Sequence, residues 1–453
     1  MLKRLFALAI LLPSVLFAQH TIKGTFSPPE DYKFVLLYKV TPEVSTYVNN
    51  AEINGRGEFE FQLDSTITKG IYKLVYAIPQ EDYNFDVIYN GNEDVELTFN
   101  SEIGVKFQSS VENTLLASYT NSMYMVTSSI GKFFREEAKD TLALSAIFKT
   151  QRETQSNYEE AAKGTIALNF IKANKPYIPN QVEDAATYVG NLKTHYFDAV
   201  DFENETLQSS DFLIERMFNY VFGVSADSID EATSYIKNIK TFGTIIKTAP
   251  AKIKKQLFID LWQQMADLNF ESVANFIAEE TLMDLAVSLN DQELLHALIL
   301  YKNISIGNKA PDFPIEIKEK DKLVTKKLSE LDVAESYILV FWSSMCSHCL
   351  EEIPQLQTYL KTKEKGLVQV VAIGLEDEPY KWKDLTYNYP EFIHVYGEGK
   401  WDNEIGKAYG VTGTPTYFIL NKNKELAARP EDLEAVKAFF GEKEKEAQEL
   451  DEK

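Results

Sequence analysis

The stretch that decides the fold of the C-terminal part is YILVFWSSMCSHCLEEIP, residues 337–354. It holds Cys346 and Cys349, the only two cysteines of the 453-residue chain, between an apolar run and a segment of helical character. This order predicts a thiol at the N-terminus of a helix, where free backbone N–H groups and the helix dipole favour an anion. The thiolate is the reactive form of cysteine, and a second thiol three residues on can resolve a mixed disulfide by exchange.

Two structural roles compete with redox chemistry for this pair. A closed zinc site needs about four ligands, and the other histidines show no metal-ligand spacing: His20, His195, His296 and His394. A disulfide closing a loop of about four residues would stabilise the fold by only roughly 2 kcal/mol. The pattern therefore favours a redox-active pair and predicts no bound metal.

Residues 1–18 predict a signal peptide. Basic residues at positions 3 and 4 precede a nearly continuous apolar run over 5–17, which is too short to span a bilayer comfortably. Cleavage is expected near Ala18-Gln19, although Leu16 is larger than the residue usual at its position. No later run of about 18 uncharged apolar residues exists, so we expect no stable membrane insertion. The expected location is the periplasm or another exported, oxidising compartment.

Charge excludes some partners. The chain has 68 acidic and 46 basic residues and a formal net charge of −22. Nucleic acids and anionic membranes need basic surfaces, so neither is expected as a partner. At about 150 residues per domain, the length allows about three domains.

The first expected domain, residues 19–103, is an antiparallel β-sandwich with an accessory role. Phe59, Phe61 and Leu63 alternate with polar residues, and residues 95–99 show the same period of two. Asn54-Gly55 and Asn90-Gly91 supply turns between such strands.

The second expected domain, residues 104–302, is all-α. Apolar residues recur at helical spacing in segments such as 253–268, where Leu257, Leu261 and Met265 belong to one stripe. The simplest interpretation is a bundle of packed helices.

The third expected domain, residues 303–441, is α/β. Strands are predicted at 337–342, 367–373, 416–420 and 426–428, and helices at 347–361, 379–387, 402–409 and 430–440. Such alternation predicts a mixed sheet. Residues 442–453 form a charged tail with no assigned function.

Three motifs in this last domain resemble the TlpA/ResA-like thioredoxin family. They are the segment 341–354 around the cysteines, GNKAPDF at 307–313, and YGVTGTPT at 409–416. The resemblance covers about the last third of the chain and implies a thioredoxin fold. Residues 19–302 are similar, more weakly, to accessory regions found before such domains in exported bacterial proteins.

The resemblance also implies roles for single residues. Cys346 would be the attacking thiolate and Cys349 the buried resolving thiol. Pro415 would be a cis-proline facing them, with the Thr414 backbone pairing with an extended client segment, and Trp342 and Met345 would contact the client as well. Glu352 matches a glutamate that the family places near the resolving cysteine, where it could carry that thiol's proton.

Two positions depart from the family pattern. Met345 replaces a common tryptophan, which changes the apolar surroundings of the sulfur. His348 takes the place of a usual proline, and an imidazolium there would favour the thiolate and a more oxidising disulfide. Val340 stands where thioredoxin proper has a buried aspartate, which makes Glu352 more important.

The sequence therefore predicts an exported thiol:disulfide oxidoreductase that reduces or isomerises disulfides in client proteins. The Cys346–Cys349 disulfide would be its redox group, with no other cofactor. Expected partners are clients that carry disulfides or thiols and a membrane-bound thiol reductant. The clients, the direction of the reaction, and the choice between monomer and homodimer stay open.

Two other functions compete with this prediction. A peroxidase of the peroxiredoxin kind would use Ser343 three residues before Cys346, but Leu339 stands where its proline should be and Cys349 is too close to be the usual resolving cysteine. The second is a non-enzymatic client-binding protein on a thioredoxin scaffold. The intact cysteines and the Thr414-Pro415 pair argue against such degeneration.

Overall fold

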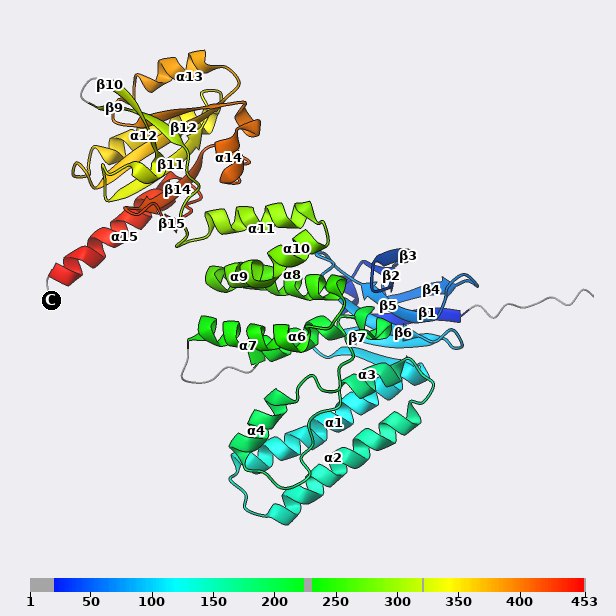
Figure 1. Cartoon of the computed structure of the whole chain (residues 1–453). Coiled ribbons are helices and arrows are strands. Elements are labelled where there is room, and N and C mark those ends of the chain that lie inside the picture. The colour runs from blue at the N-terminus through cyan, green and yellow to red at the C-terminus, as the bar shows by residue number, and fades with distance from the viewer. Residues whose placement is uncertain (1–19, 224–229, 320–321, 452–453) are drawn as a thin grey trace, which may run out of the picture. The chain divides into compact units, whose positions relative to one another are not determined.

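The computed structural model describes residues 20–223, 230–319 and 322–451 (Figure 1). The predicted signal peptide, residues 1–18, lies outside the described residues. The chain divides into two compact units, Met1–Leu257 and Phe258–Lys453. The three-domain boundaries given above stay a prediction.

The first unit begins with two four-stranded sheets (Figure 1). One has the order β4 (Glu58–Leu63), β1 (His20–Ser27), β7 (Val95–Asn100), β8 (Gly104–Ser109). The other has the order β3 (Ser45–Glu52), β2 (Phe34–Val40), β5 (Gly70–Val75), β6 (Asn84–Tyr89). Alternate residues of both sheets, such as Phe61 and Leu74, bury in one shared core, so the predicted β-sandwich is confirmed.

One strand pair differs from the antiparallel prediction, because β1 and β7 pair in parallel. The two strands lie about 70 residues apart in sequence, and pairing between distant strands is not fixed by a hairpin turn. Within β4 the expected alternation holds, with Phe59, Phe61 and Leu63 buried.

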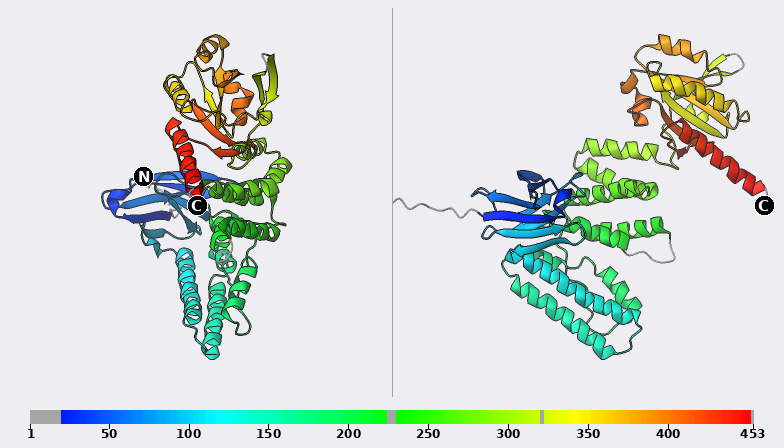
Figure 2. Two further views of the ribbon diagram at one scale, coloured as in Figure 1. Left: turned by 90° about the vertical axis from the view of Figure 1, so that its left-hand side faces the viewer. Right: turned by 180° about the vertical axis from the view of Figure 1, so that it is seen from behind.

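Helices follow the sandwich, as predicted (Figures 1 and 2). They are α1 (Val111–Arg135), α2 (Thr141–Ala161), α3 (Ala167–Ala173), α4 (Ala185–Thr194), α5 (Glu205–Gln208), α6 (Phe212–Gly223), α7 (Glu231–Ile245) and α8 (Ala251–Asp267). Several begin at side chains that accept hydrogen bonds from first-turn N–H groups, namely Ser110, Asp140, Asp184 and Asp230. The stripe predicted in α8 is buried at Leu257, Leu261 and Met265.

The second unit continues with helices before its sheet. These are α9 (Glu271–Ile277), a π-helical turn (Ala278–Leu282), α10 (Met283–Ser288) and α11 (Gln292–Ile304). A two-stranded ribbon of β9 (Pro314–Glu319) and β10 (Lys322–Lys327) follows.

A five-stranded sheet forms the centre of the C-terminal domain, in the order β13-β12-β11-β14-β15. Its strands are β11 (Ser336–Trp342), β12 (Val368–Glu376), β13 (Ile393–Glu398), β14 (Thr416–Asn421) and β15 (Leu426–Ala428). Its helices are α12 (Ser347–Leu360), α13 (Pro379–Thr386), α14 (Glu404–Ala408) and α15 (Leu433–Asp451). Parallel β11–β12 and antiparallel β11–β14 pairs give the predicted mixed sheet and confirm the thioredoxin fold.

Both faces of this sheet are covered, which explains the unbroken apolar run in β11. Ile338, Val340 and Trp342 pack with residues of α12 and α15. The alternate residues Leu339 and Phe341 belong to the core on the other face. A strand covered on both sides reads as a continuous hydrophobic run rather than an alternating one.

Two elements of the C-terminal domain escaped prediction. The ribbon β9–β10 is rich in charges, and β13 contains a glycine and follows a proline, so neither shows a clear period of two. The charged tail continues α15 as far as Asp451.

Among the described residues, none of the helices combines the length and apolar character needed to cross a membrane.

Candidate functional site

The chain leaves the central strand β11 and enters α12 through a short turn that carries the cysteines. Cys346 is the N-cap of α12, and its sulfur accepts a hydrogen bond from the backbone N–H of Cys349 at 3.3 Å. The turn is braced from within, since the Cys346 N–H donates to the Ser343 carbonyl at 3.1 Å. The sulfur of Cys346 therefore lies where unpaired N–H groups at the helix start stabilise a thiolate.

The two thiols have different surroundings and opposite pKa shifts. Burial acts to raise the pKa of Cys346. Hydrogen bonds with the side chains of Cys349 and Thr414 and with the backbone of Cys349 and His348 outweigh it, and the net pKa is lowered. Cys349 is fully buried, and burial together with the Cys346 hydrogen bond raises its pKa to about 12. Cys346 remains partly accessible to solvent. One thiol is thus ready to react while its neighbour stays protonated.

The loop before β14 approaches the cysteines from the other side. Its Thr414–Pro415 peptide bond is cis, as the family resemblance implies. The Cys346 thiol donates to the Thr414 carbonyl oxygen at 3.2 Å. Of the predicted substrate-binding residues, Thr414 thus lies against the sulfur of Cys346.

Glu352 lies on α12 within hydrogen-bond reach of a residue that the sequence did not single out. The Tyr417 hydroxyl donates to Glu352 Oε2 at 2.7 Å. Burial raises the pKa of Tyr417, and the charges of Glu352 and Cys349 raise it further, so all three groups share one electrostatic environment. Glu351, by contrast, is exposed. Tyr417 lies two positions after Pro415, but nothing in the sequence relates it to Glu352.

A second residue that the sequence did not single out is Glu376, at the end of β12. It is only 4% exposed, and its Oε1 accepts a hydrogen bond from the backbone N–H of Ser344 in the cysteine turn. The signal in the sequence was a carboxylate at the end of a mostly apolar strand. Glu376 holds the turn that presents Cys346.

The remaining predicted residues lie around the pair at different depths. Met345 is 70% exposed, and its sulfur accepts a contact from Lys381 Nζ at 3.3 Å. His348 is exposed, and a hydrogen bond from its backbone N–H helps to lower the pKa of Cys346. Trp342 was predicted to touch the client, but it is only 1% exposed and packs edge to face with Tyr389. It lies at the end of a strand covered on both faces, so it supports the site from below.

In the described part of the chain, no group of three or more His, Cys, Asp or Glu side chains has the arrangement of a metal site.

The C-terminal domain is similar in sequence to known thioredoxin-like proteins. Residues 335–426 match the family model of thioredoxin-like proteins. ResA, a thiol-disulfide oxidoreductase of Bacillus thuringiensis subsp. konkukian, is 29% identical over 127 residues, which cover 28% of this chain and 69% of ResA. The ResA of Oceanobacillus iheyensis is 30% identical over 129 residues, covering 27% of this chain and 62% of that protein.

Among solved structures, a domain of a possible thiol-disulfide isomerase from Cytophaga hutchinsonii is 27% identical. It covers 32% of this chain and 95% of that domain, with a TM-score of 0.26.

Proposed function

We propose that this chain, whose C-terminal part is a thioredoxin-like oxidoreductase domain of the ResA/TlpA type, is an exported enzyme that reduces or isomerises disulfides in client proteins. The enzyme class, a thiol-disulfide oxidoreductase, follows from the family match and the relatives. The roles of single residues, the export and the clients are our proposal.

The observation that carries the proposal is the asymmetry of the cysteine pair. Cys346 is accessible with a lowered pKa, and Cys349 is buried with a pKa raised to about 12. An attacking thiol must be ionised and reachable, whereas a resolving thiol must wait until the first bond has formed.

The reaction begins when the Cys346 thiolate attacks one sulfur of a client disulfide. A bond forms between Cys346 and that sulfur, the client disulfide breaks, and its other sulfur leaves as a thiolate. Cys349 then loses its proton and attacks the sulfur of Cys346. The Cys346–Cys349 disulfide forms, the second client sulfur leaves, and two electrons have passed to the client.

The proton of Cys349 needs an acceptor, because a thiol with so high a pKa is not ionised at neutral pH. Glu352 is the proposed acceptor, held by the hydroxyl of Tyr417. The protein has no buried aspartate in β11, since Val340 stands at that place.

The client would lie over Thr414, Pro415 and the exposed side chain of Met345. An extended client segment can pair with backbone groups of the Thr414–Pro415 loop, as in strand addition. Met345 offers a flexible apolar contact that adapts to different client side chains.

The Cys346–Cys349 disulfide is the proposed redox group, with no other cofactor, and a membrane-bound thiol donor would reduce it again. His348, which is exposed and lies between the two cysteines in the place of the family's usual proline, is the reason to keep both reduction and isomerisation in view. The predicted cleavage near Ala18-Gln19 would release the protein into an oxidising compartment.

Insulin-disulfide reduction by the purified mature protein tests this proposal. The wild type should be active, and Cys346→Ser should lose at least about 100-fold in rate because the nucleophile is gone. Cys349→Ser should accumulate a mixed disulfide that a thiol reductant releases. Activity that survives Cys346→Ser would contradict the proposal and favour the non-enzymatic client-binding function.

The reduction potential decides the direction. A value near −270 mV would support reduction, and a value near −120 mV oxidation. N-terminal sequencing of the exported protein tests the cleavage site, which should leave Gln19 as the first residue.

A further inference from the structure

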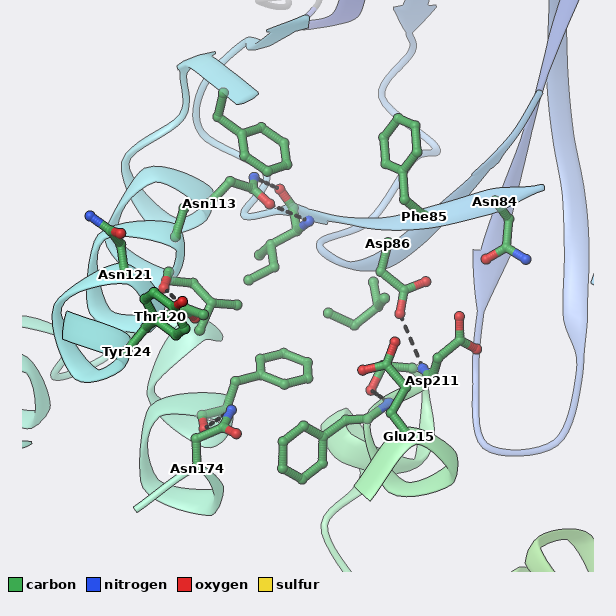
Figure 3. A pocket seen from close by; sticks show the side chains of 18 residues that line it. Asn84, Phe85, Asp86, Asn113, Thr120, Asn121, Tyr124, Asn174, Asp211 and Glu215 are labelled. Atoms are coloured by element: carbon green, nitrogen blue, oxygen red, sulfur yellow. Dashed lines mark hydrogen bonds between the residues drawn. The ribbon is translucent and has the colours of Figure 1, made fainter. Parts of the chain in front are cut away.

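A large cavity in the first unit lies against β6, far in sequence from the cysteines. Its volume is about 680 Å³, and its walls come from β5, β6, α1, α3 and α6. Figure 3 shows the side chains that surround it. Phe170 and Phe212 form an apolar wall, edge to face with ring centroids 6.0 Å apart. Asn121 and Tyr124 line the side formed by α1.

The strand at this cavity is the last of its sheet and has an open edge. β6 pairs with β5 only. The side-chain amide of Asn113 accepts from the Ile88 N–H at 2.9 Å and donates to the Ile88 carbonyl at 2.7 Å, as a neighbouring strand would (Figure 3). This contact shows that the backbone groups of Ile88 point away from β5.

The alternation of an antiparallel ladder then fixes the direction of Asp86. Residues two apart point their N–H and C=O groups to the same side, so those of Asp86 face the open edge as well. Asn113 covers Ile88 alone, and no residue outside the β5–β6 ladder is hydrogen-bonded to the Asp86 backbone in the described part of the chain. The open edge of β6 is therefore hydrogen-bonded at Ile88, whereas the backbone groups of Asp86 on that edge have no partner among the described residues.

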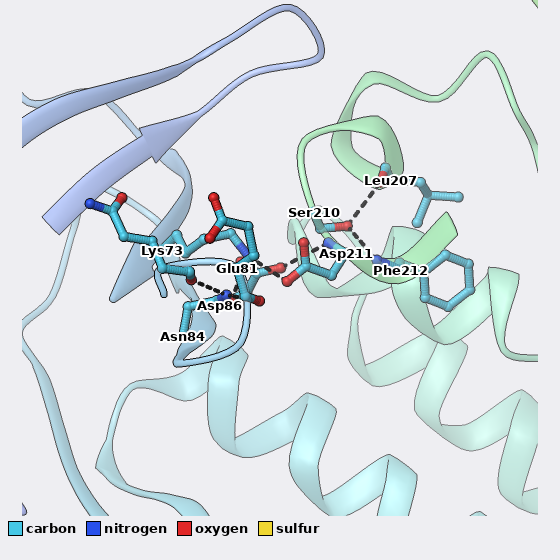
Figure 4. Close-up of polar contacts among 9 residues, drawn as sticks. Lys73, Glu81, Asn84, Asp86, Leu207, Ser210, Asp211 and Phe212 are labelled. Carbon is cyan, nitrogen blue, oxygen red and sulfur yellow. Dashed lines mark hydrogen bonds and ion pairs between the residues drawn. The ribbon is translucent and has the colours of Figure 1, made fainter. Parts of the chain in front are cut away.

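Carboxylates gather at the same end of the cavity. Lys73 Nζ pairs with Asp86 at 3.1 Å and with Asp211, and it donates to Asn84 Oδ1 at 2.8 Å (Figure 4). The contacts with Asn84 and Asp211 are hydrogen bonds, whereas the contact with Asp86 is an ion pair, and Asp86 Oδ1 accepts no hydrogen bond among the described residues. Glu215 lines the same cavity as a third carboxylate.

The balance of charge at this end is therefore negative. Three carboxylates face one ammonium group, and Glu215 has no ion pair in the described part of the chain. Burial raises the pKa of Glu215, and the neighbouring Asp211 and Asp86 raise it further. These groups do not form a metal site in the described residues. An organic cation is the group that this end of the cavity lacks.

We propose that the cavity beside β6 binds an extended peptide segment that carries a lysine or arginine and, two residues away, a large apolar side chain. The segment adds to the open edge of β6 opposite Asp86. Its basic side chain reaches Glu215 and Asp211, and its apolar side chain packs on Phe170 and Phe212. Residues two apart in an extended chain point to the same face, which sets the spacing. This site would hold a partner protein on the first unit, whereas the cysteines belong to the second.

Fluorescence anisotropy with the full mature protein tests the site. The probe is a fluorescein-labelled peptide of sequence GSTKSFTSG, which has no cysteine, so its binding is independent of the redox chemistry. Replacing its lysine by glutamate should weaken binding at least about tenfold, since a charge pair becomes a repulsion. Replacing its phenylalanine by serine should also weaken binding.

Glu215→Lys should reverse the charge preference, so that the glutamate peptide binds this variant better than the lysine peptide. Glu153→Lys, an exposed glutamate on α2 outside the cavity, is the matched control and should leave both affinities unchanged. The swap separates direct contact from loss of folding, because a misfolded protein would bind neither peptide.

N-methylation tests the added strand. A methyl group on the lysine nitrogen of the backbone should weaken binding at least about tenfold, because that N–H faces β6. The same group on the serine between lysine and phenylalanine should have little effect, because that N–H points away.

Three results would overturn the proposal. The first is an absence of binding at 1 mM peptide, and the second is binding that Glu215→Lys leaves unchanged. The third is a charge preference without any effect of N-methylation, which would mean that the cavity takes a cation without strand addition. None of these results bears on insulin reduction, so the enzymatic proposal would stand.

Discussion

The cysteine site and the cavity beside β6 use burial in opposite ways. At the cysteines, burial makes two chemically identical thiols differ in pKa. Cys349 is buried and its pKa is raised, whereas Cys346 stays partly exposed and its pKa is lowered. At the cavity, burial raises the pKa of both Asp86 and Glu215. Two thiols with different pKa values can take different steps of one reaction, the first as a thiolate and the second as a thiol. Two carboxylates whose pKa values are both raised do not form a pair of acid and base. The first arrangement suits bond exchange and the second suits recognition of a cation.

The largest expected effect comes from removing the ammonium group that pairs with two carboxylates of the cavity. Lys73→Met leaves Asp86 and Asp211 without a counter-ion, and we expect a loss of about 3 kcal/mol of stability in the first unit. Hydrogen exchange of β5 and β6 measures it, because all four tryptophans lie in Phe258–Lys453 and report only on the second unit.

Lys23→Met is the control for this loss. Lys23 pairs with Glu96 at 3.3 Å on the same sandwich, but both side chains are over 40% exposed, at 43% and 47%. Its loss should cost less than about 0.5 kcal/mol. If the two variants lose the same stability, the partly buried carboxylates at β6 depend on their counter-ion no more than an exposed carboxylate does.

The raised pKa of Cys349 predicts that the reduced protein loses stability at alkaline pH. The folded-state pKa of about 12 lies above that of the unfolded chain, so the stabilising contribution is complete below pH about 9 and is lost as pH rises from there. At pH 10.5 the loss should be roughly 2 kcal/mol. Urea unfolding followed by tryptophan fluorescence, under reducing conditions at pH 8 and 10.5, measures it.

Cys349→Ala separates this effect from the buried tyrosines that also titrate there. The variant should show a smaller loss between the two pH values than the wild type. An identical loss in the variant and the wild type would mean that burial does not raise the pKa of Cys349 above that of the unfolded chain.

Glu352→Gln should slow the second exchange step about tenfold at pH 7, because the proton of Cys349 loses its acceptor. The release of client from a preformed mixed disulfide, followed by rapid mixing, measures this step. Tyr417→Phe should have a smaller effect, since it removes only the hydrogen bond that orients the carboxylate. Glu351→Gln is the matched control, because Glu351 is exposed on the same helix. If Glu352→Gln and Glu351→Gln behave alike, the proton takes another route.

The sequence predicted the two regions to very different extents, for a physical reason. Cys346, Cys349 and Glu352 lie within about two turns at the start of α12, so a short motif shows them together. Thr414 and Pro415 came from the family resemblance. Glu376 and Tyr417 approach the site from neighbouring strands, and their contacts depend on strand order, which no local pattern gives.

The cavity could not be predicted at all, because its walls come from residues between 71 and 215. Residues 84–89 alternate too weakly to indicate an edge strand, and nothing local relates Lys73 to Asp211. Fold class was accessible because period and composition report it, whereas a site built from distant elements was not.

The smallest expected effect is also the most specific to the cavity. Glu215→Gln should raise the stability of the first unit by about 0.3 kcal/mol at pH 7. The value is small because the side chain, although partly desolvated where it lines the cavity, remains largely open to solvent. The pKa of Glu215 is raised in the folded state, so the charged form opposes folding, and the gain should shrink as pH falls toward its pKa. Hydrogen exchange of β6 at pH 7 and pH 5 measures it, with Glu153→Gln as control. If Glu215→Gln binds the lysine peptide less tightly but is more stable than the wild type, Glu215 serves ligand binding. A residue whose role is structural would stabilise the fold, so its loss would lower the stability. A loss of stability would instead assign Glu215 to a structural contact.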